Sequence, residues 1–251
     1  MRLEDTKENK IFIKQIEIDI TNKCNLNCAS CTHFSPLVNE VVEYDLITFE
    51  NDMGRLSSLF AISNIKLLGG EPFLYSELDR LVDILIKYFP KTKISIFTNG
   101  ILEQKIIDFK HNYPQVNLVQ SKYPIINNVD SIKNIKDKTR FRHPSLNING
   151  DSNPINAKLV CHSKDCISLF NGRLYICPVM RNIKTFEQAF NLNLGLSLND
   201  YSINIYEHTN SEILIFLLSF DKGLKSCRYC SEFASGIDWH ISNKNIEEWI
   251  K

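Results

Sequence analysis

The hydrophobic and polar positions in the first half of the chain follow two periods in turn. Ile16, Ile18 and Ile20 are separated by acidic residues, and this strict alternation predicts a strand. Apolar residues at helical spacing follow at residues 49–60, and a short apolar run comes next at residues 65–68. The order strand, helix, strand predicts a βαβ unit with parallel strands.

The same order continues to about residue 148. A helix over residues 78–89 is expected to begin at a capping box of Ser76 and Asp79 and to end at Pro90. The other expected elements are strands at residues 94–98, 116–120 and 140–148 and helices at residues 102–109, 129–135 and 211–219. Repeated βα units predict an α/β fold, an open parallel partial barrel with its site at the C-terminal strand ends.

The pattern changes near residue 149, where Gly150, Pro154 and new cysteines appear. We expect a core, residues 1–149, and a second module, residues 150–251. In this module Asn171 and Gly172 separate two apolar runs and predict a β-hairpin. Counting outward from the turn pairs Cys166 with Cys177, and directly paired residues have Cβ atoms about 4.5–5.5 Å apart.

Composition limits the possible functions. The chain has 251 residues, 29 of them basic and 29 acidic, and this balance argues against nucleic acid as a partner. The longest apolar run, Ile213–Leu218, is far shorter than the ~20 residues of a membrane span. The start, residues 1–10, is charged and lacks the apolar core of a signal peptide, so we expect a cytoplasmic protein without membrane attachment.

Cysteines occur in two groups rather than as an evenly distributed framework. In a cytoplasmic protein this distribution predicts metal ligands rather than disulfides. The eight cysteines are Cys24, Cys28, Cys31, Cys161, Cys166, Cys177, Cys227 and Cys230.

Cys24, Cys28 and Cys31 directly follow the first predicted strand, in the spacing C-x3-C-x2-C. Thiolates select iron-sulfur clusters, zinc or copper(I), and a four-iron cluster normally takes four of them. Three thiolates leave one iron open to a small molecule, as a catalytic zinc keeps one position free. The alternative is a zinc knuckle or a purely structural cluster.

Two further strand ends carry polar loops that suit a ligand site. Gly69, Gly70 and Glu71 end the second predicted strand, and Thr98 and Asn99 end the third. Glycines allow a ligand to approach the backbone, and loops after parallel strands form the sites of α/β folds. Either motif alone is also a common turn.

The three motifs, in this order, resemble the signature of the radical SAM enzymes, which have a partial (β/α)6 barrel. In that family three cysteines hold a 4Fe-4S cluster whose open iron is chelated by S-adenosylmethionine. One feature differs, because Ser30 stands where the family usually has an aromatic residue. The resemblance implies that Cys24, Cys28 and Cys31 hold the catalytic cluster and that Gly69, Gly70, Glu71, Thr98, Asn99 and Ser121 bind S-adenosylmethionine. For Ser121 the alternative is a turn serine.

The second group of cysteines resembles the auxiliary-cluster modules called SPASM and twitch. No cysteine follows Cys230, so the likeness is to the shorter twitch type, which holds one auxiliary 4Fe-4S cluster. The thiols that compete for its four positions are Cys161, Cys166, Cys177, Cys227 and Cys230. Either Cys161 or Cys166 is then the spare one, or the cluster differs from the twitch type. A structural zinc is the alternative for this group.

The resemblance implies a specific first half of the reaction. An electron, from a reductase such as flavodoxin or ferredoxin, leads to cleavage of S-adenosylmethionine and a 5′-deoxyadenosyl radical, which takes a hydrogen atom from the substrate. Oxidation, epimerisation and bond formation all remain open as outcomes. Because the first strand begins at Ile16, we expect no peptide-recognition domain before it, and this favours a small molecule, such as a sugar or nucleotide sugar, over a ribosomal peptide.

Two alternatives remain. One is a maturase of a peptide or protein, and the other is a non-catalytic iron-sulfur electron carrier or zinc scaffold. Trp239 and His240 are expected to pack rather than to contact substrate.

Overall fold

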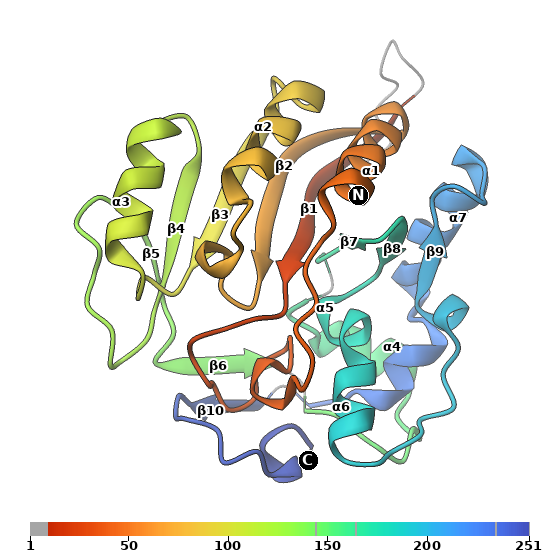
Figure 1. The fold of residues 1–251 in the computed structure, drawn as a ribbon. Coiled ribbons are helices and arrows are strands. Elements are labelled where there is room, and N and C mark those ends of the chain that lie inside the picture. The colour runs from red at the N-terminus through yellow and green to blue at the C-terminus, as the bar shows by residue number, and fades with distance from the viewer. Residues whose placement is uncertain (1–9, 144, 164, 234, 251) are drawn as a thin grey trace.

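A large curved sheet organises the molecule (Figure 1). The computed structural model describes residues 10–143, 145–163, 165–233 and 235–250, so the charged start lies almost entirely outside the described residues. Within them, eight strands form this sheet and two form a small pair. In spatial order the large sheet contains β5 (Asn134–Asp137), β4 (Asn117–Lys122), β3 (Lys93–Thr98), β2 (Phe60–Gly69), β1 (Ile11–Thr21), β7 (Ser168–Phe170), β8 (Arg173–Tyr175) and β9 (Ser202–Asn204), and the pair is β6 (Arg140–His143) with β10 (Ser235–Asp238).

Three helices connect the first four strands and lie along one face of the sheet (Figure 1). They are α1 (Leu46–Leu59), α2 (Leu78–Tyr88) and α3 (Glu103–Asn112). The parallel register aligns Ile18 of β1 with Leu67 of β2, and Leu67 with Ile96 of β3, and all three side chains are fully buried with the helices. Glu17 and Asp19 alternate with these residues, so β1 presents an acidic inner face opposite its apolar outer face.

The α/β class and the parallel order of the core are confirmed, and four local predictions are wrong. The strand expected at residues 140–148 ends at His143, as β6. Residues 129–135 do not form a helix, because the Gln120 side chain bonds the backbone of Asn127 and Val129 and holds a turn before the exposed strand β5. The predicted capping box of α2 is absent, since its N-cap is Glu77 without a side-chain bond. β2 begins at Phe60 rather than near residue 65.

The predicted hairpin forms and continues the core sheet. β7 lies parallel to β1, with Ser168 opposite Glu17, and β8 and β9 follow in antiparallel order. The register counted from the Asn171-Gly172 turn is confirmed for every pair in the ladder. The ladder ends at Ser168 and Tyr175, so the predicted pairing of the cysteines beyond it is not part of the hairpin.

A buried carboxylate fixes this hairpin to the core. Asp52 of α1 is 1% exposed and accepts hydrogen bonds from the hydroxyls of Tyr44 (2.5 Å) and Tyr206 (2.6 Å) and from the backbone N–H of Gly172 (2.6 Å). The turn that joins β7 to β8 is therefore held against α1. The order of the chain places these groups far apart, and only the fold brings them together.

Four further helices and six short 3-10 turns complete the described residues (Figure 1). The helices are α4 (Pro154–Val160), α5 (Pro178–Arg181), α6 (Ile183–Ala189) and α7 (Asn210–Ser219), and the 3-10 turns are η1 (Ser35–Leu37), η2 (Pro72–Leu74), η3 (Leu198–Asp200), η4 (Phe220–Lys222), η5 (Lys225–Tyr229) and η6 (Ile246–Glu248). The expected helix near residues 211–219 is confirmed as α7.

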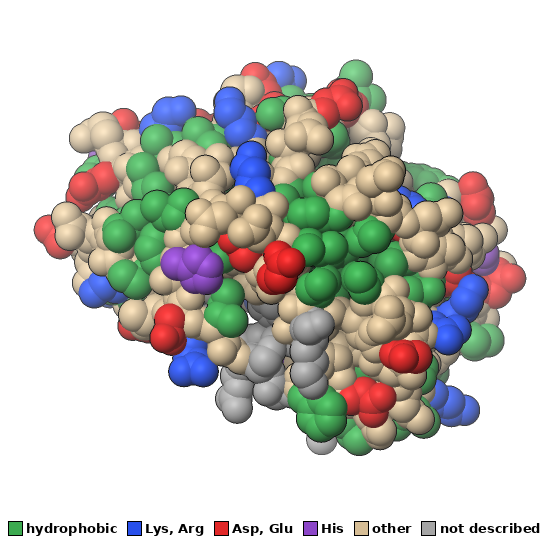
Figure 2. Space-filling model, turned by 90° about the horizontal axis from the view of Figure 1, so that it is seen from below, with side chains coloured by type: hydrophobic (Ala, Val, Ile, Leu, Met, Phe, Trp, Pro, Cys, Tyr) green, Lys and Arg blue, Asp and Glu red, His purple; other side chains and the backbone are tan. Residues whose placement is uncertain are grey.

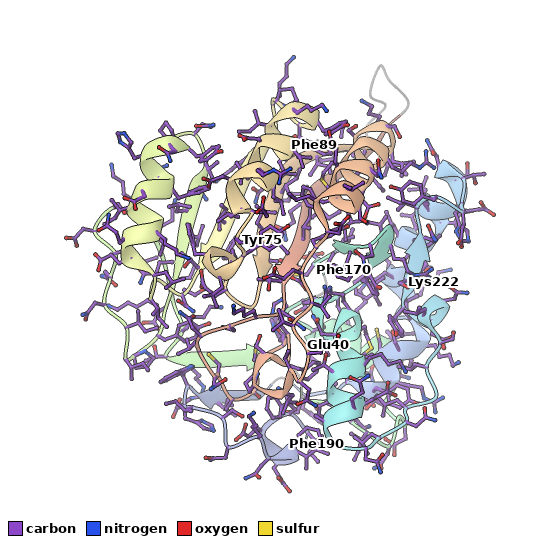
Figure 3. All side chains as sticks on the ribbon, viewed as in Figure 1. Glu40, Tyr75, Phe89, Phe170, Phe190 and Lys222 are labelled. Carbon is purple, nitrogen blue, oxygen red and sulfur yellow. The ribbon has the colours of Figure 1, made fainter. Side chains whose placement is uncertain are left out.

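Two apolar cores result from this arrangement. One lies between the sheet and α1 to α3, and Phe89 belongs to it; the other lies under α5 and α6, where Phe190 packs, and Phe170 contacts both (Figure 3). On the face shown in Figure 2, acidic and basic side chains are interspersed, as the zero net charge leads one to expect. No helix among the described residues has the length and apolar character needed to cross a bilayer.

Candidate active site at the carboxyl ends of β1 to β4

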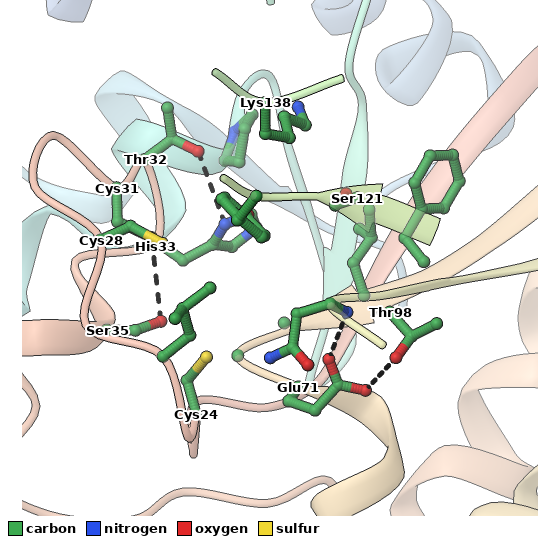
Figure 4. A pocket seen from close by; sticks show the side chains of 18 of the residues that line it. Cys24, Cys28, Cys31, Thr32, His33, Ser35, Glu71, Thr98, Ser121 and Lys138 are labelled. Carbon is green, nitrogen blue, oxygen red and sulfur yellow. Dashed lines mark hydrogen bonds between the residues drawn. The ribbon is translucent and has the colours of Figure 1, made fainter. Parts of the chain in front are cut away.

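A cavity of about 430 Å3 lies at the carboxyl ends of the first four strands. Figure 4 shows Cys24, Cys28 and Cys31 on one side of it, and Glu71, Thr98 and Ser121 on the strand ends beside them. The predicted residues that line this single cavity are Cys24, Cys28, Cys31, Gly69, Gly70, Glu71, Thr98, Asn99 and Ser121, and Cys166 lines it as well.

The loop that carries the three cysteines is covered by the C-terminal segment, residues 239–250. The N–H of Ala29 donates to the carbonyl of His240 (3.1 Å), and the N–H of Ser242 donates to the carbonyl of Asn27 (2.9 Å). The Trp249 indole donates to the carbonyl of Cys31 (3.0 Å). The far end of the chain thus completes the environment of a loop near its start.

Burial controls the three thiols of this loop. It raises the pKa of Cys24 and of Cys28 to about 12. Burial also opposes ionisation of Cys31, but the hydrogen bond and charge of His33 outweigh it and hold the pKa of Cys31 below its ordinary value. Metal binding by these thiols therefore releases protons, because the ligand is the thiolate.

His33 owes its charge to a buried acid on β1. Asp19 is 2% exposed, lies 3.3 Å from the His33 ring and 3.2 Å from the Arg181 guanidinium, and keeps a pKa well below its usual range although burial opposes this. Burial disfavours the imidazolium, yet the Asp19 carboxylate raises the pKa of His33 to about 10. A fixed positive charge therefore lies beside Cys31.

The two glycines of the β2 loop allow close packing on the cysteine loop. A Cβ on Gly70 would lie 2.0 Å from the carbonyl oxygen of Lys23. A Cβ on Gly69 would lie 2.1 Å from the carbonyl oxygen of Thr21, and the φ of Gly69 is +134°. Gly70 donates its N–H to Thr21 (2.7 Å). Only glycine fits here, and the reason is contact between two backbones.

Glu71 connects the ends of β2 and β3. Its carboxylate is 1% exposed and accepts from the Thr98 hydroxyl (2.7 Å) and from the N–H groups of Asn99 (2.7 Å) and Phe73 (3.2 Å). Burial raises the pKa of Glu71 to about 7 although these three bonds favour the anion. The Asn99 side chain reaches the cysteine loop, where its amide donates to Asn25 (2.8 Å).

Polar residues that the motifs did not identify line the rest of the cavity. Glu17 of β1 lies 3.4 Å from Lys66, and burial together with Glu17 raises the pKa of the Cys166 thiol to about 12. Lys138 enters from the segment after β5 (Figure 4), and burial and the neighbouring Lys136 lower its pKa. Glu17 could have been identified from the sequence, because it is an acidic residue on the inner face of the first predicted strand.

The other four cysteines lie at the ends of short elements in the second half. Cys161 ends α4, Cys177 precedes α5, and Cys227 and Cys230 belong to or follow η5. Burial raises the pKa of Cys177, and the charges of Cys230, Cys161 and Cys227 contribute to the shift, so these four thiols are electrostatic neighbours. Cys166 is the one that faces the cavity of the core.

The arrangement of the cysteine triad suits a cluster. Among the described residues no three His, Cys, Asp or Glu side chains gather closely enough to bind one metal ion. A closed structural zinc needs four ligands that converge on a point. A four-iron cluster is wider and takes its thiolates from around a space, and Cys24, Cys28 and Cys31 are arranged around such a space.

Comparison with known proteins agrees with this fold. Residues 18–120 match the profile of the Radical SAM superfamily. The crystal structure of BtrN in complex with AdoMet and 2-DOIA has a similar fold, with a TM-score of 0.56 and 17% identity, over 90% of this chain and 100% of that one.

Curated relatives match somewhat more than a third of the chain. The probable GTP 3′,8-cyclase of Aeropyrum pernix is 32% identical over 102 residues, 36% of this chain and 26% of that protein. The S-adenosyl-L-methionine-dependent 2-deoxy-scyllo-inosamine dehydrogenase of Niallia circulans is 32% identical over 93 residues, 37% of each chain. The chain therefore spans only about a quarter to a third of the length of these relatives.

Proposed function

We propose that this protein cleaves S-adenosylmethionine reductively and removes a hydrogen atom from a small-molecule substrate. The observation that carries the proposal is the single cavity shared by the cysteine triad and the loops after β2, β3 and β4. An electron carrier or a zinc scaffold has no need of such a ligand cavity beside its metal. Electrons would come from a reductase such as flavodoxin or ferredoxin.

Cys24, Cys28 and Cys31 would hold the catalytic 4Fe-4S cluster, which together with S-adenosylmethionine supplies a 5′-deoxyadenosyl radical when bound. Glu71 is suited to orient the amino group of the methionine part. A carboxylate has about four acceptor positions, and three on Glu71 are used by the protein, so one remains for the ligand. Thr98 and Asn99 then act by holding that carboxylate in place.

The second half of the chain would hold an auxiliary cluster through Cys161, Cys177, Cys227 and Cys230. Their mutual electrostatic proximity supports this set, and the position of Cys166 against Glu17 supports leaving it out. Such a cluster would either accept an electron from a substrate radical or stabilise the module. Because the first role leads to an oxidised product, we favour oxidation over epimerisation as the outcome.

Charged and polar side chains in the lining of the cavity point to a hydrophilic substrate. They include Glu17, Lys138, Arg140 and His162. A cavity of about 430 Å3 suits a small ligand rather than a long peptide. A sugar or nucleotide sugar fits these conditions. The dehydrogenase named among the relatives acts, by its name, on another small molecule.

A comparison of two cysteines that line the same cavity tests the proposal. Cys28→Ser should abolish 5′-deoxyadenosine formation in dithionite, because two thiolates cannot hold the open cluster firmly, whereas Cys166→Ser should retain it. After anaerobic reconstitution the wild type and Cys166→Ser should each bind about eight iron per chain. The proposal is wrong if Cys28→Ser forms the nucleoside at a rate close to that of the wild type.

A further inference from the structure

Cys28 differs from the other two thiols of the triad in the origin of its hydrogen-bond donors. The indole nitrogen of Trp239 donates to its sulfur over 3.1 Å, and the hydroxyl of Tyr123 also donates to it. Cys24 is bonded by the nearby backbone of Leu26, and Cys31 by His33 and Ser35. The donors to Cys28 come from segments that lie about one hundred and two hundred residues further along the chain.

The position of Trp239 is fixed from both sides. Its backbone N–H donates to the carbonyl of Thr139 (2.7 Å), and the next residue accepts from Ala29 of the cysteine loop (3.1 Å). Its ring lies 5.8 Å from that of Tyr123, between centroids, at an interplanar angle of 49°. Because the backbone and the ring are both held, the indole N–H is aimed at the sulfur before any cluster binds.

From this geometry we infer that Trp239 and Tyr123 raise the reduction potential of the catalytic cluster by donating hydrogen bonds to the Cys28 sulfur. The inference rests on the proposed function, since it requires the cluster that Cys24, Cys28 and Cys31 would hold. Trp239 and Tyr123 are positioning residues, and neither needs to touch the substrate.

The physical reason is the charge that reduction adds to a buried site. Cys28 is 5% exposed, and an extra electron near it is costly because little water screens the charge. Hydrogen bonds to cluster sulfurs stabilise the more negative state, and they are among the features that set iron-sulfur potentials. Removing a donor therefore makes the cluster harder to reduce without removing a ligand.

The test is a potentiometric titration of the reconstituted full-length protein, followed by electron paramagnetic resonance, with Trp239→Phe and Tyr123→Phe. Because the clusters of both halves titrate, the catalytic one is identified by the change in its signal when S-adenosylmethionine is added. We expect each variant to lower the equilibrium constant for its one-electron reduction about tenfold, a shift of about 59 mV to more negative potential.

Trp249→Phe is the matched control. Its indole donates to the carbonyl oxygen of Cys31 rather than to a sulfur, so the same substitution removes packing and a hydrogen bond from the same loop. The potential of this variant should equal that of the wild type. An equal shift in Trp249→Phe, or no shift in Trp239→Phe and Tyr123→Phe, overturns the inference.

A measurement on the wild type keeps the inference falsifiable if a variant loses iron. Electron-nuclear double resonance of the reduced protein in H2O and D2O should reveal exchangeable protons coupled to the catalytic cluster, and these should be fewer in Tyr123→Phe. Absence of such coupling overturns the inference while the proposed function stands. A wild type that assembles iron but shows no signal sensitive to S-adenosylmethionine contradicts both.

Discussion

Glu71 is a buried acid whose protonation is balanced close to neutral pH. Burial raises its pKa to about 7, while three donors favour the anion. Without a bound cation, its contribution to folding is favourable below a pH of about 4.5 and is lost as the pH rises through about 7. A bound amino group that donates to Glu71 would reverse this preference, because it stabilises the carboxylate.

The first prediction follows for ligand binding. The affinity for S-adenosylmethionine should rise about eightfold between pH 6 and pH 7.5, because only the ionised Glu71 binds the amino group of the cofactor. Glu71→Gln should bind the cofactor more weakly, should keep its iron, and should lose this pH dependence. The measurement is isothermal titration calorimetry of the reconstituted protein under anaerobic conditions.

Glu17→Gln is the control for this prediction. Glu17 lines the same cavity but lies away from the three strand-end loops, so the variant should keep the pH dependence of the wild type. An unchanged pH dependence in Glu71→Gln would mean that another group titrates, and the role proposed for Glu71 would be withdrawn.

Local motifs identified the residues of the site that are close in sequence. Cys24, Cys28 and Cys31, and the loops at Glu71 and Asn99, follow strands whose ends must meet at one edge of a parallel sheet, so their convergence on one cavity was predictable. Tyr123 and Trp239 were not predictable as partners of Cys28, because nothing local relates them to it. Their contact depends on how β10 and the C-terminal segment return across the cysteine loop.

At the scale of elements, the predictions held where periodicity and turn chemistry agreed. The hairpin around Asn171 and Gly172 has the expected register because a two-residue turn fixes which residues face each other. The helix expected at residues 129–135 failed because its apolar spacing was weak and a single side chain, Gln120, determines the local turn. Side-chain bonds of this kind leave no periodic signal in the sequence.

The second prediction concerns the fixing of that hairpin to α1. Asp52→Ala should lower the free energy of unfolding by roughly 3 kcal/mol, because it leaves the buried donors of Tyr44, Tyr206 and Gly172 without their acceptor. The measurement is urea denaturation followed by tryptophan fluorescence under anaerobic conditions.

A surface carboxylate provides the comparison for Asp52. Asp83 accepts a hydrogen bond from the Tyr113 hydroxyl (3.0 Å), but this pair is exposed to water. Asp83→Ala should change the free energy of unfolding by no more than about 0.5 kcal/mol. If both variants have equally small effects, the Asp52 network does not hold the hairpin to the core.

At the scale of the whole molecule, the division of the chain at residues 149 and 150 separates the cysteine groups but not the structure. β7 adds to β1 as a further parallel strand of the same sheet, and the segment at residues 239–250 bonds to the cysteine loop near the start. The polypeptide of the second half is thus part of the environment of the first site. The auxiliary thiols Cys161, Cys177, Cys227 and Cys230, by contrast, lie outside the cavity of that site.

The core could depend on the second half in two ways, through its polypeptide or through its metal. A variant that loses only the metal distinguishes them. Changing both Cys227 and Cys230 to Ala should remove about four iron per chain. It should also lower the stability of the module, because small modules often fold around their metal. Formation of 5′-deoxyadenosine in dithionite without substrate should persist per folded molecule. The catalytic thiols, the strand-end loops and the covering C-terminal segment all remain in this variant. Turnover of the true substrate should be lost.

A chain that ends at residue 149 should behave in the opposite way. It keeps every motif residue of the catalytic site, yet it lacks β7 beside β1, the Trp239 contact with Cys28 and the bonds from His240 and Trp249 to the loop. We expect it to be insoluble or to lose its cluster, and to form no 5′-deoxyadenosine. The measurement is iron content and 5′-deoxyadenosine per folded molecule for both variants. If the truncated chain retains uncoupled cleavage, the core does not need the protein of the second half. If the double cysteine variant loses uncoupled cleavage while it stays folded, the core depends on the auxiliary metal.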